Sequence, residues 1–438
     1  MDEGSFVQQL AINDDFNSGG LGATQELGML TRNLVWTLVS LIALCSPIAR
    51  AQGVATAAAE PRPTPTPEEY EKRSLGFSER IERTGLADDF AGVTTDGHVV
   101  PGLFELRSTG VSTAPVVTAA NDFLAALTAE QRARARFPVE DEEWRKWANQ
   151  HIYHRDGVSF EEMSDAQRKA AFGLLAASLS AKGLQLSRDI MRLNETLGEL
   201  NNGNFVEYGE WKYFITIMGH PSADQPWGWQ LDGHHLNVNY FVLGDQVVMT
   251  PAFWGSEPVI AKGGKYAGTR IMEAEQDAGL KLVRALTDVQ RGQAILDDAK
   301  PGNNALAQAF SDNLVLDYAG VKVASFNDAQ RSLLLDLVAL YVGNLREGHA
   351  EVHLAVIESY LDETYFAWIG GTDDGSVFYY RIHSPVTLIE FDHQRPVGLK
   401  HLYPDGPNHE HVHSVLRTPN GNDYGKDLLR QHYDAHAH

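Results

Sequence analysis

The stretch of residues 227–258 constrains the fold of this chain more than any other, because it has the pattern of a two-stranded hairpin. Apolar residues alternate with other residues over 236–242, which is the two-residue period of a β-strand. Gly244 and Asp245 then provide a tight turn, and residues 246–250 form the predicted return strand. The centre of the chain is therefore expected to be sheet.

Two adjacent histidines, His234 and His235, stand directly before the first of these strands. Neighbouring side chains on a strand point to opposite faces, so the two rings cannot share one face if both residues belong to the strand. One ring is expected to face a site, and the other to lie in packing or to support its neighbour. The sequence leaves open which of the two faces the site.

Strand-like segments gather in two blocks, at about residues 205–260 and 364–418, and the segments around them show helical spacing of apolar residues. Helices and strands thus come in blocks and do not alternate strictly, which favours an α+β fold over a doubly wound one. We predict an antiparallel sheet core built from the two blocks and flanked by helical segments. Helices are expected over 69–87, 122–136, 140–150, 164–182, 184–201, 270–300 and 325–360.

A helix-start motif occurs four times in the chain. A Ser, Thr or Asn is followed three positions later by Gln, which is the capping-box pattern, and Arg comes next. We interpret the motifs as four separately capped helices, and a duplicated helical unit flanking the central sheet is the alternative. The motifs span Thr128–Arg132, Ser164–Arg168, Thr287–Arg291 and Asn327–Arg331.

The N-terminal region has the pattern of a secretory signal peptide. Residues 29–51 combine a short basic segment, an apolar run and an Ala-x-Ala site that ends at Ala51. Residues 1–28 are patternless, and we interpret them as an extension of the gene model beyond a true start at Met29. The mature protein is therefore predicted to be secreted or periplasmic, and a lipoprotein anchored at Cys45 is the alternative.

The rest of the chain is predicted to form one folded domain with an extension at each end. Residues 52–69 are rich in Pro, Ala and Thr, which is typical of an extended linker. Residues 70–431 form the predicted single large α+β domain, and 432–438 a His-containing tail without fixed structure. Cleavage after Ala51 removes Cys45, the only cysteine, so neither a disulfide nor a cysteine metal site is expected in the mature chain.

The chain is strongly acidic, with a formal net charge of −22 over 438 residues. Such a charge opposes binding to nucleic acid or to an anionic membrane surface. A hydrophobic content of 43% is enough for a sizeable core. The charge thus predicts no nucleic-acid partner. We also expect a small-molecule or carbohydrate ligand, and no membrane span in the mature chain.

Histidines and carboxylates in the second strand block are candidate metal ligands. His411 and His413 are two residues apart, so they share a face if they lie on a strand, and the same holds for Glu390 and Asp392. Neutral imidazole and carboxylate are ligands of zinc, copper, iron or manganese. The alternative is a solvated, His-rich edge of the sheet.

Other residues are weaker candidates for the site. His409 continues the spacing of His411 and His413, and the pair His349 and His353 has the i, i+4 spacing that places both rings on one helical face. The alternative for that pair is an ordinary helix surface.

Aromatic and basic residues beside these motifs are candidates for contacts with a substrate. Trp227 and Trp229 suit an aromatic wall for a sugar or another ring-bearing ligand, or else belong to the core. Arg381 is a candidate substrate-binding cation and Arg417 a candidate catalytic one. Either arginine can instead pair with a carboxylate of the same strand block as structure.

Several of these motifs together resemble the domain-of-unknown-function family numbered 3500, and the resemblance covers roughly residues 70–430. It implies that Gly233-His234-His235 and His411-Val-His413 belong to one site, and it implies neither a metal nor a substrate. The residues that carry it are Gly228-Trp229-Gln230, Gly233-His234-His235-Leu236, Thr250-Pro251, Gly255, Tyr380-Arg381-Ile382, Ile389-Glu390-Phe391-Asp392, His411-Val-His413 and the segment from Arg417 to Gly425.

These patterns predict a secreted or periplasmic metalloprotein that acts as a metal-dependent enzyme. Hydrolysis is favoured over oxidation because it needs no partner cofactor. One alternative is a non-catalytic extracellular binding protein that uses an aromatic surface, and another is a structural module whose histidines bind nothing. The residues assigned to the predicted site are His234 or His235, His411 and His413 as ligands of a divalent metal, and Glu390 or Asp392 as a further ligand or general base.

Overall fold

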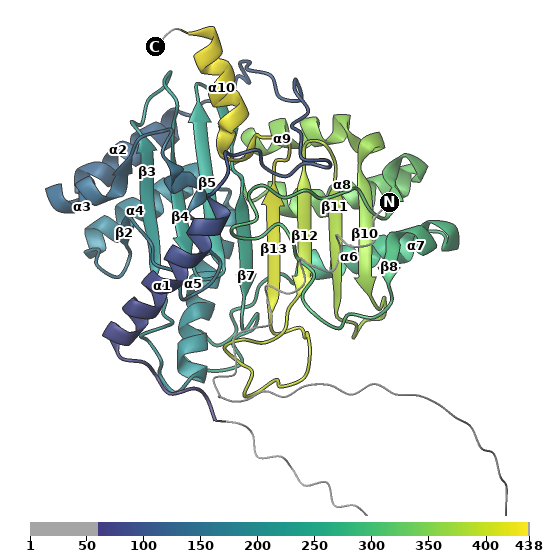
Figure 1. Ribbon diagram of the computed structural model, residues 1–438, viewed down its shortest axis with the longest axis horizontal. Helices are drawn as coiled ribbons and strands as arrows, with labels where there is room; N and C mark the ends of the chain where they lie inside the picture. The colour runs from purple at the N-terminus through teal and green to yellow at the C-terminus, as the bar shows by residue number, and fades with distance from the viewer. Residues whose placement is uncertain (1–59, 437–438) are drawn as a thin grey trace, which may run out of the picture. The chain divides into compact units, whose positions relative to one another are not determined.

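One mixed sheet, in which most strand pairs are antiparallel, forms the framework of residues 60–436, the part of the chain that the computed structural model describes (Figure 1). The strand order is β1-β3-β4-β5-β7-β13-β12-β11-β10-β8, and β2, β6 and β9 pair with β3, β5 and β10. The predicted α+β fold is confirmed. The strands are Arg136–Phe137 (β1), Val158–Ser159 (β2), Tyr213–Gly219 (β3), Trp227–Gly233 (β4), Leu236–Leu243 (β5), Gln246–Val248 (β6), Ala252–Ser256 (β7), Ile295–Asp297 (β8), Val321–Lys322 (β9), Tyr365–Gly370 (β10), Phe378–His383 (β11), Leu388–His393 (β12) and Val412–Arg417 (β13).

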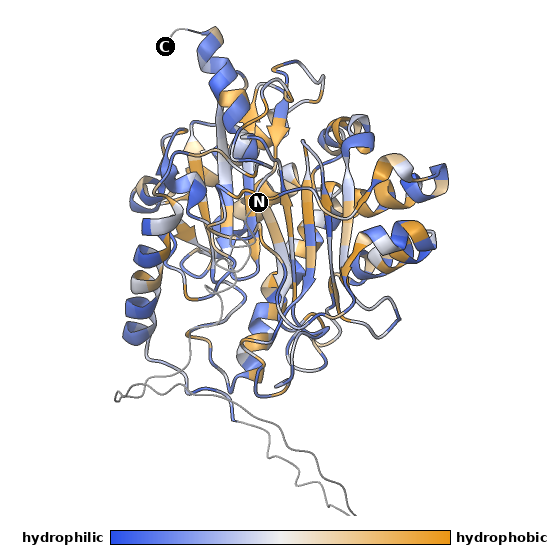
Figure 2. Cartoon of the chain, turned by 45° about the vertical axis from the view of Figure 1, so that its right-hand side comes forward, coloured by the Kyte–Doolittle hydropathy of each residue, from blue (hydrophilic) through white to orange (hydrophobic). Residues whose placement is uncertain are grey.

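The helices cover the two faces of this sheet unequally. Helices α2 to α4 lie behind one half of the sheet in Figure 1 and α6 to α9 behind the other half, while α1 crosses in front. Apolar residues are concentrated along the strands between these layers (Figure 2). The helices are Pro67–Gly85 (α1), Ala114–Ala126 (α2), Ala129–Ala135 (α3), Asp165–Ser178 (α4), Ala181–Leu200 (α5), Glu273–Ala285 (α6), Asp288–Ala294 (α7), Asp328–Val342 (α8), His349–Ser359 (α9) and Lys426–Ala435 (α10).

The sheet separates two apolar cores. On the face that we call the helix-covered face, residues such as Trp229 and Tyr240 pack with the inner sides of α2, α4, α5, α6, α8 and α9. On the opposite face, the loop-covered face, Phe253 and Val415 pack with Trp147 and other residues of loops and of α10. Side chains of one strand alternate between these two faces, so each strand contributes to both cores.

The sheet order reads the same from both ends. Strand β1 pairs in parallel with β3, and β8 pairs in parallel with β10. Strands β3, β4 and β5 follow one another antiparallel, as do β10, β11 and β12. Helices α2 to α5 belong to the first set and α6 to α9 to the second. The fold therefore contains one arrangement twice, with the antiparallel pair of β7 and β13 at the centre.

All four predicted capping boxes form, with both reciprocal hydrogen bonds present in each. Their glutamines also link helices of the same half. The amide of Gln167 donates to Gln131 Oε1 over 2.7 Å, and that of Gln330 donates to Gln290 Oε1 over 2.8 Å. The four helices are capped as predicted, and their matching places in the two halves also support the alternative, a helical unit that occurs twice.

Several predicted helical ranges are wrong in their extent, and the range 270–300 contains two helices and the strand β8. The helix expected over 122–136 is divided in two, because Thr128 adopts an extended conformation and caps α3. The helix expected over 140–150 is only the 3₁₀ turn Glu142–Arg145. The carbonyl group of Trp144 accepts a hydrogen bond from a side chain of the sheet, so it does not continue a helix.

The predicted boundaries at both ends of the domain also change. Helix α1 begins at Pro67 with Thr66 as its cap, because proline has no N–H to lose at the first helical position. The last residues of the predicted linker over 52–69 are therefore helical. Helix α10 runs to Ala435 and buries His432, so the first residues of the predicted tail over 432–438 are folded.

The predicted signal peptide, its cleavage site and Cys45 lie outside the described residues. Among residues 60–436, no helix has both the length and the apolar composition needed to cross a membrane.

Candidate metal centre

Three buried histidines bring their ring nitrogens together on the loop-covered face. His411 Nε2 lies 3.1 Å from His235 Nε2 and 3.0 Å from His413 Nε2. All three ligand atoms lie within 4.8 Å of one another. Nitrogens that bind one zinc ion tetrahedrally at 2.0–2.1 Å are about 3.3 Å apart, so small movements of the rings suffice to admit a metal.

The strand β13 explains why two of the rings meet. His411 immediately precedes the strand and His413 is its second residue, so both side chains project from the same face. Gly255 of β7 lies directly opposite His413, and its N–H donates to the carbonyl oxygen of His235 over 2.9 Å. Because Gly255 has no side chain, the ring of His235 reaches His413 across β7.

The third ring comes from the tight turn between β4 and β5. Gly233 pairs with Leu236, so His234 and His235 form a two-residue hairpin loop. His235 has a φ of 61°, in the left-handed region that costs a residue with a side chain roughly 1–2 kcal/mol. Its N–H donates to the carbonyl oxygen of Asn149 over 3.1 Å, which helps to hold this conformation. The turn thus aims His235 at the strand β13.

The outer nitrogens of two of the rings lie against oxygen atoms that accept hydrogen bonds. His411 Nδ1 lies 2.7 Å from the carbonyl oxygen of Arg395, and His413 Nδ1 lies 2.9 Å from Gln308 Oε1. With these oxygens as partners, both Nδ1 atoms carry the hydrogen. In a neutral ring this leaves Nε2 as a bare lone pair, and two lone pairs 3.0 Å apart repel unless a cation or a proton lies between them.

Burial favours the neutral form of two of the three rings. It lowers the pKa of His235 and of His413 well below the ordinary value, and the nearby His411 adds to the effect. Neutral imidazole is the form that a divalent metal binds.

His234 lies outside this cluster. Its ring stacks on that of His235 with centroids 3.9 Å apart, and its Nδ1 lies 2.8 Å from Asn194 Oδ1. The structure thus answers the question that the sequence leaves open, because His235 faces the cluster and His234 supports it from behind.

The predicted carboxylates are not brought to the cluster. Asp392 pairs with Lys300 over 2.7 Å, and Glu390 accepts the hydroxyl of Tyr379 over 2.6 Å. Both carboxylates also accept backbone N–H groups from residues 304–307. Among the described residues, the cluster that could hold a metal contains no carboxylate.

The predicted arginines are also engaged elsewhere. Arg417 is fully buried, pairs with Asp423 over 2.6 Å and donates to the carbonyl oxygen of Ala307. Arg381 donates to the carbonyl oxygen of Asp317 over 3.2 Å. These contacts match the structural alternative that the sequence analysis gives for the arginines, although with different partners.

The predicted aromatic wall is wrong. Trp227 and Trp229 both have 0% of their surface exposed, and both belong to the core of the helix-covered face. Trp229 stacks on Tyr240 with ring centroids 5.3 Å apart. The alternating pattern of β4 explains this placement, because every second side chain of a strand with helices on that face is buried.

The weaker histidine candidates do not join the cluster either. His353 Nε2 lies 2.7 Å from the carbonyl oxygen of Val247, an acceptor that occupies it. His409 Nδ1 lies 3.2 Å from His393 Nε2, so it belongs to a separate histidine pair.

Sequence reasoning missed the groups that orient the rings. Gln308 lies in a loop without a motif, and Arg395 acts through its backbone carbonyl, which any residue type provides. Glu257, which lies 3.8 Å from His411 Nδ1, was missed as well. Only the last of these gives a signal in the sequence, as an acidic residue close to the end of the predicted strand-rich block 205–260.

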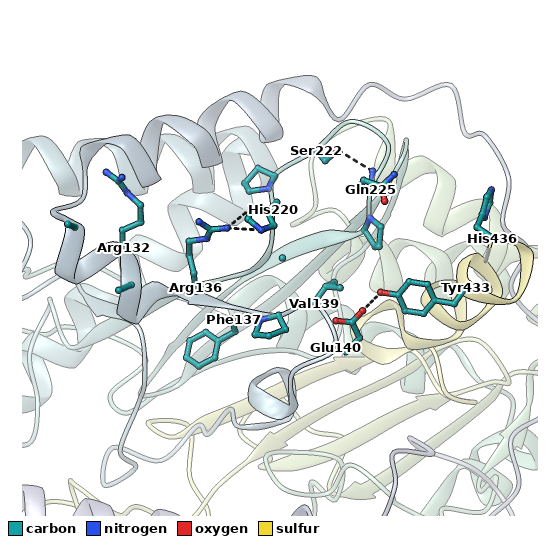
Figure 3. A pocket seen from close by; sticks show the side chains of 16 residues that line it. Arg132, Arg136, Phe137, Val139, Glu140, His220, Ser222, Gln225, Tyr433 and His436 are labelled. Carbon is teal, nitrogen blue, oxygen red and sulfur yellow. Dashed lines mark hydrogen bonds between the residues drawn. The ribbon is translucent and has the colours of Figure 1, made fainter. Parts of the chain in front are cut away.

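A surface cleft of about 1520 Å³ lies elsewhere, between α3, the end of β3 and α10 (Figure 3). Its polar side chains contact one another, because Arg136 meets His220 and Tyr433 donates to Glu140. The three clustered histidines do not line this cleft. We therefore place the candidate site at the histidines, where the chemistry is, and not at the cleft.

Comparison with known families agrees with the motifs. The family described as "Protein of unknown function (DUF3500)" matches residues 109–426. The chain belongs to this family. The matched range of this DUF3500 protein contains all three clustered histidines. Neither the curated proteins nor the solved structures include a match.

Proposed function

We propose that this DUF3500 protein is a metal-dependent enzyme whose His235, His411 and His413 bind one divalent metal ion through Nε2. The convergence of the three Nε2 atoms carries the proposal, together with the acceptors that keep two Nδ1 atoms protonated. Three protein ligands leave a coordination position for water or substrate, as in catalytic zinc sites.

The donor set favours hydrolysis over oxidation. Three neutral imidazoles leave the full +2 charge of the metal on the site, which strongly acidifies a bound water. A site of two histidines and one carboxylate, typical of non-haem iron oxygenases, does not match, because the cluster among the described residues has no carboxylate. Zinc is therefore the first metal to test, followed by copper, iron and manganese.

The surrounding residues would orient the ligands and exclude bulk water. His235, His411 and His413 are each at most 6% exposed. The ring of Phe253 packs against that of His413 with centroids 5.0 Å apart. In such an enclosed site, a substrate of small size is favoured over a polymer.

The binding-protein alternative loses its support, since Trp227 and Trp229 are buried. The alternative in which the histidines only stabilise the fold needs a proton between two Nε2 atoms, and burial opposes that proton because it lowers the pKa of His413. We propose a small-molecule partner on the basis of the enclosed site, and no nucleic-acid partner on the basis of the charge of −22.

We also propose that the protein is secreted or periplasmic. The support is the sequence pattern of residues 29–51, a basic segment, an apolar run and an Ala-x-Ala site. The N-terminal sequence of protein recovered from the native host tests this proposal. A mature terminus at Gln52 is expected, and an intact terminus at residue 1 contradicts it.

Metal analysis of protein that starts at Gln52 tests the proposed function. The protein is purified without a His tag and carries His436→Gln and His438→Gln, which removes adventitious ligands and keeps α10 intact. About one metal ion per chain is expected, and His411→Ala is expected to lose it while the far-ultraviolet circular dichroism is unchanged. No bound metal after refilling with zinc, copper, iron and manganese would contradict the proposal.

A further inference from the structure

A loop is fastened over β12 and β13 by two buried carboxylates. We call residues 300–308 the Gln308 loop. Asp392 Oδ2 accepts the N–H groups of residues 304 and 305 over 2.7 and 2.9 Å. Glu390 Oε2 accepts those of residues 306 and 307 over 3.0 and 2.7 Å. Four consecutive amides are thus bound, and the next residue, Gln308, is the one that accepts the hydrogen of His413 Nδ1.

A second loop is fastened in the same way on the other side of the cluster. We call residues 394–399 the Arg395 loop. The carboxylate of Glu257 accepts three consecutive amides of this loop, those of residues 397, 398 and 399, over 2.8–3.0 Å. The same loop presents the carbonyl oxygen of Arg395 to His411 Nδ1. The N–H of Arg395 also donates to Asn303 Oδ1 over 2.8 Å, which connects the two loops.

We propose that Glu390, Asp392 and Glu257 are positioning residues that set the tautomers of two metal ligands through these loops. The expected effect on metal affinity rests on the proposed function. Glu390 and Asp392 hold Gln308 against His413, and Glu257 holds the Arg395 carbonyl against His411. Each acceptor keeps the hydrogen on Nδ1, so Nε2 stays free to bind the metal.

The physical cost of these carboxylates supports such a role. All three are at most 2% exposed, and burying a carboxylate is costly unless hydrogen bonds satisfy it. Their oxygens face backbone N–H groups, the Lys300 ammonium group and the Tyr379 hydroxyl, so they do not serve as metal ligands. These hydrogen bonds fix the path of two loops that have no regular secondary structure.

The tautomers of the two histidines give a direct test that needs no bound metal. In ¹⁵N-histidine-labelled metal-free protein, nuclear magnetic resonance distinguishes a ring protonated at Nδ1 from one protonated at Nε2. The His411→Gln and His413→Gln variants assign the two signals. We expect Nδ1–H for both rings in the parent protein. Each carboxylate clamp should then affect only the ring that its own loop contacts. Glu390→Gln is expected to shift His413 alone, because Glu390 holds the Gln308 loop only, and Glu257→Gln is expected to shift His411 alone.

Zinc affinity, measured by competition with a chelator, gives the second readout. Loss of an outer hydrogen-bond partner typically lowers metal affinity about 10–100-fold, and this loss is expected for Glu390→Gln and Glu257→Gln. Gln308→Leu removes only the acceptor and should act on His413 even if the clamp variants do not fold. Gln308→Glu keeps an acceptor and should restore both the tautomer and the affinity.

A buried carboxylate away from both loops provides the matched control. Glu275 is 4% exposed and pairs with Lys182, so Glu275→Gln should leave both tautomers unchanged. The inference would be overturned if the clamp variants or Gln308→Leu left both tautomers unchanged. It would also be overturned if the clamp variants shifted both rings equally. A parent protein that binds no zinc would instead remove the proposed function, and the tautomers would still decide the role of the clamps.

Discussion

Asp392 lies directly opposite His413 on the neighbouring strand, yet its carboxylate binds the backbone of residues 304 and 305 and the ammonium group of Lys300. The two side chains share one face of the sheet, so their proximity alone would suggest a ligand and its partner. The hydrogen bonds of the carboxylate assign it to a loop instead. Its position on the shared face suggests a role at the metal site, whereas its hydrogen bonds show that it holds a loop.

The two adjacent histidines of the hairpin turn should respond differently to substitution. His235→Ala removes a ligand, and metal affinity is expected to fall by more than the roughly 100-fold that marks the upper end for an outer partner. His234→Ala removes a ring that stacks on the ligand, so a smaller loss is expected. Chelator competition measures both. Equal affinities of the two variants would contradict the assignment of His235 to the cluster.

The glycine between the ligands should not tolerate a side chain. A Cβ at Gly255 would lie 2.4 Å from the carbonyl oxygen of Val412 in the central strand pair. Gly255→Ala is therefore expected to destabilise the protein by about 1–3 kcal/mol and to weaken metal binding. Urea unfolding measures the first effect and metal analysis the second.

Gly292 in α7 offers the matched control, since a Cβ there has no neighbour within 4 Å. Gly292→Ala is expected to stabilise the protein by about 0.5–1 kcal/mol, because alanine favours the helix. Destabilisation by both variants alike would show that the crowding at Gly255 is not the cause.

The metal-free protein should lose stability as the pH falls below about 6.5. Burial lowers the pKa of His383 to about 3 and that of His349 to about 4, so the unfolded chain binds protons that the folded chain does not. Each net proton lowers the free energy of unfolding by about 1.4 kcal/mol per pH unit. The described histidines with a lowered pKa are His151, His234, His235, His349, His353, His383, His393 and His413.

Buried carboxyl groups act in the opposite direction but are fewer. Burial raises the pKa of Asp232 and of Asp392 to about 6, so the folded state binds their protons first and gains stability as the pH falls from about 6 towards the unfolded value. The other described carboxyls with a raised pKa are Glu143, Glu390 and Asp423. Urea unfolding at pH 7.5 and 5.5 should give the smaller free energy at pH 5.5. His383→Leu should reduce the difference, and equal values at both pH values in the parent would contradict the prediction.

The two halves of the fold should respond alike to loss of their linking glutamines. Gln167→Ala and Gln330→Ala each remove a capping box and a buried hydrogen bond to a second glutamine. Each is expected to cost about 1–3 kcal/mol, because the partner glutamine is left unsatisfied. Thermal unfolding and metal analysis together check that stability falls and metal binding persists. A large loss in only one variant would contradict equivalent roles.

Local patterns in the sequence were sufficient for the secondary structure that depends on neighbours in the chain. The period of residues 236–242, the turn at Gly244 and the caps at Thr128 and Asn327 all act within a few residues, and each is present in the structure. The prediction of a helix over 140–150 was wrong because this segment bonds to residues that are distant in the chain. The carbonyl oxygen of Trp144 accepts a hydrogen bond from the side chain of Gln230 in β4.

The candidate site likewise has features that follow from local sequence and features that depend on the tertiary structure. The spacing of His411 and His413 on a strand is a local property, and the sequence by itself determined that their rings share a face. Only the tertiary structure decided that His235 and not His234 joins them, because a left-handed turn and the bare Gly255 direct that ring across β7. It also decided that Glu390 and Asp392 clamp a loop, since a carboxylate binds whichever donors the fold brings to it and the sequence does not record which those are.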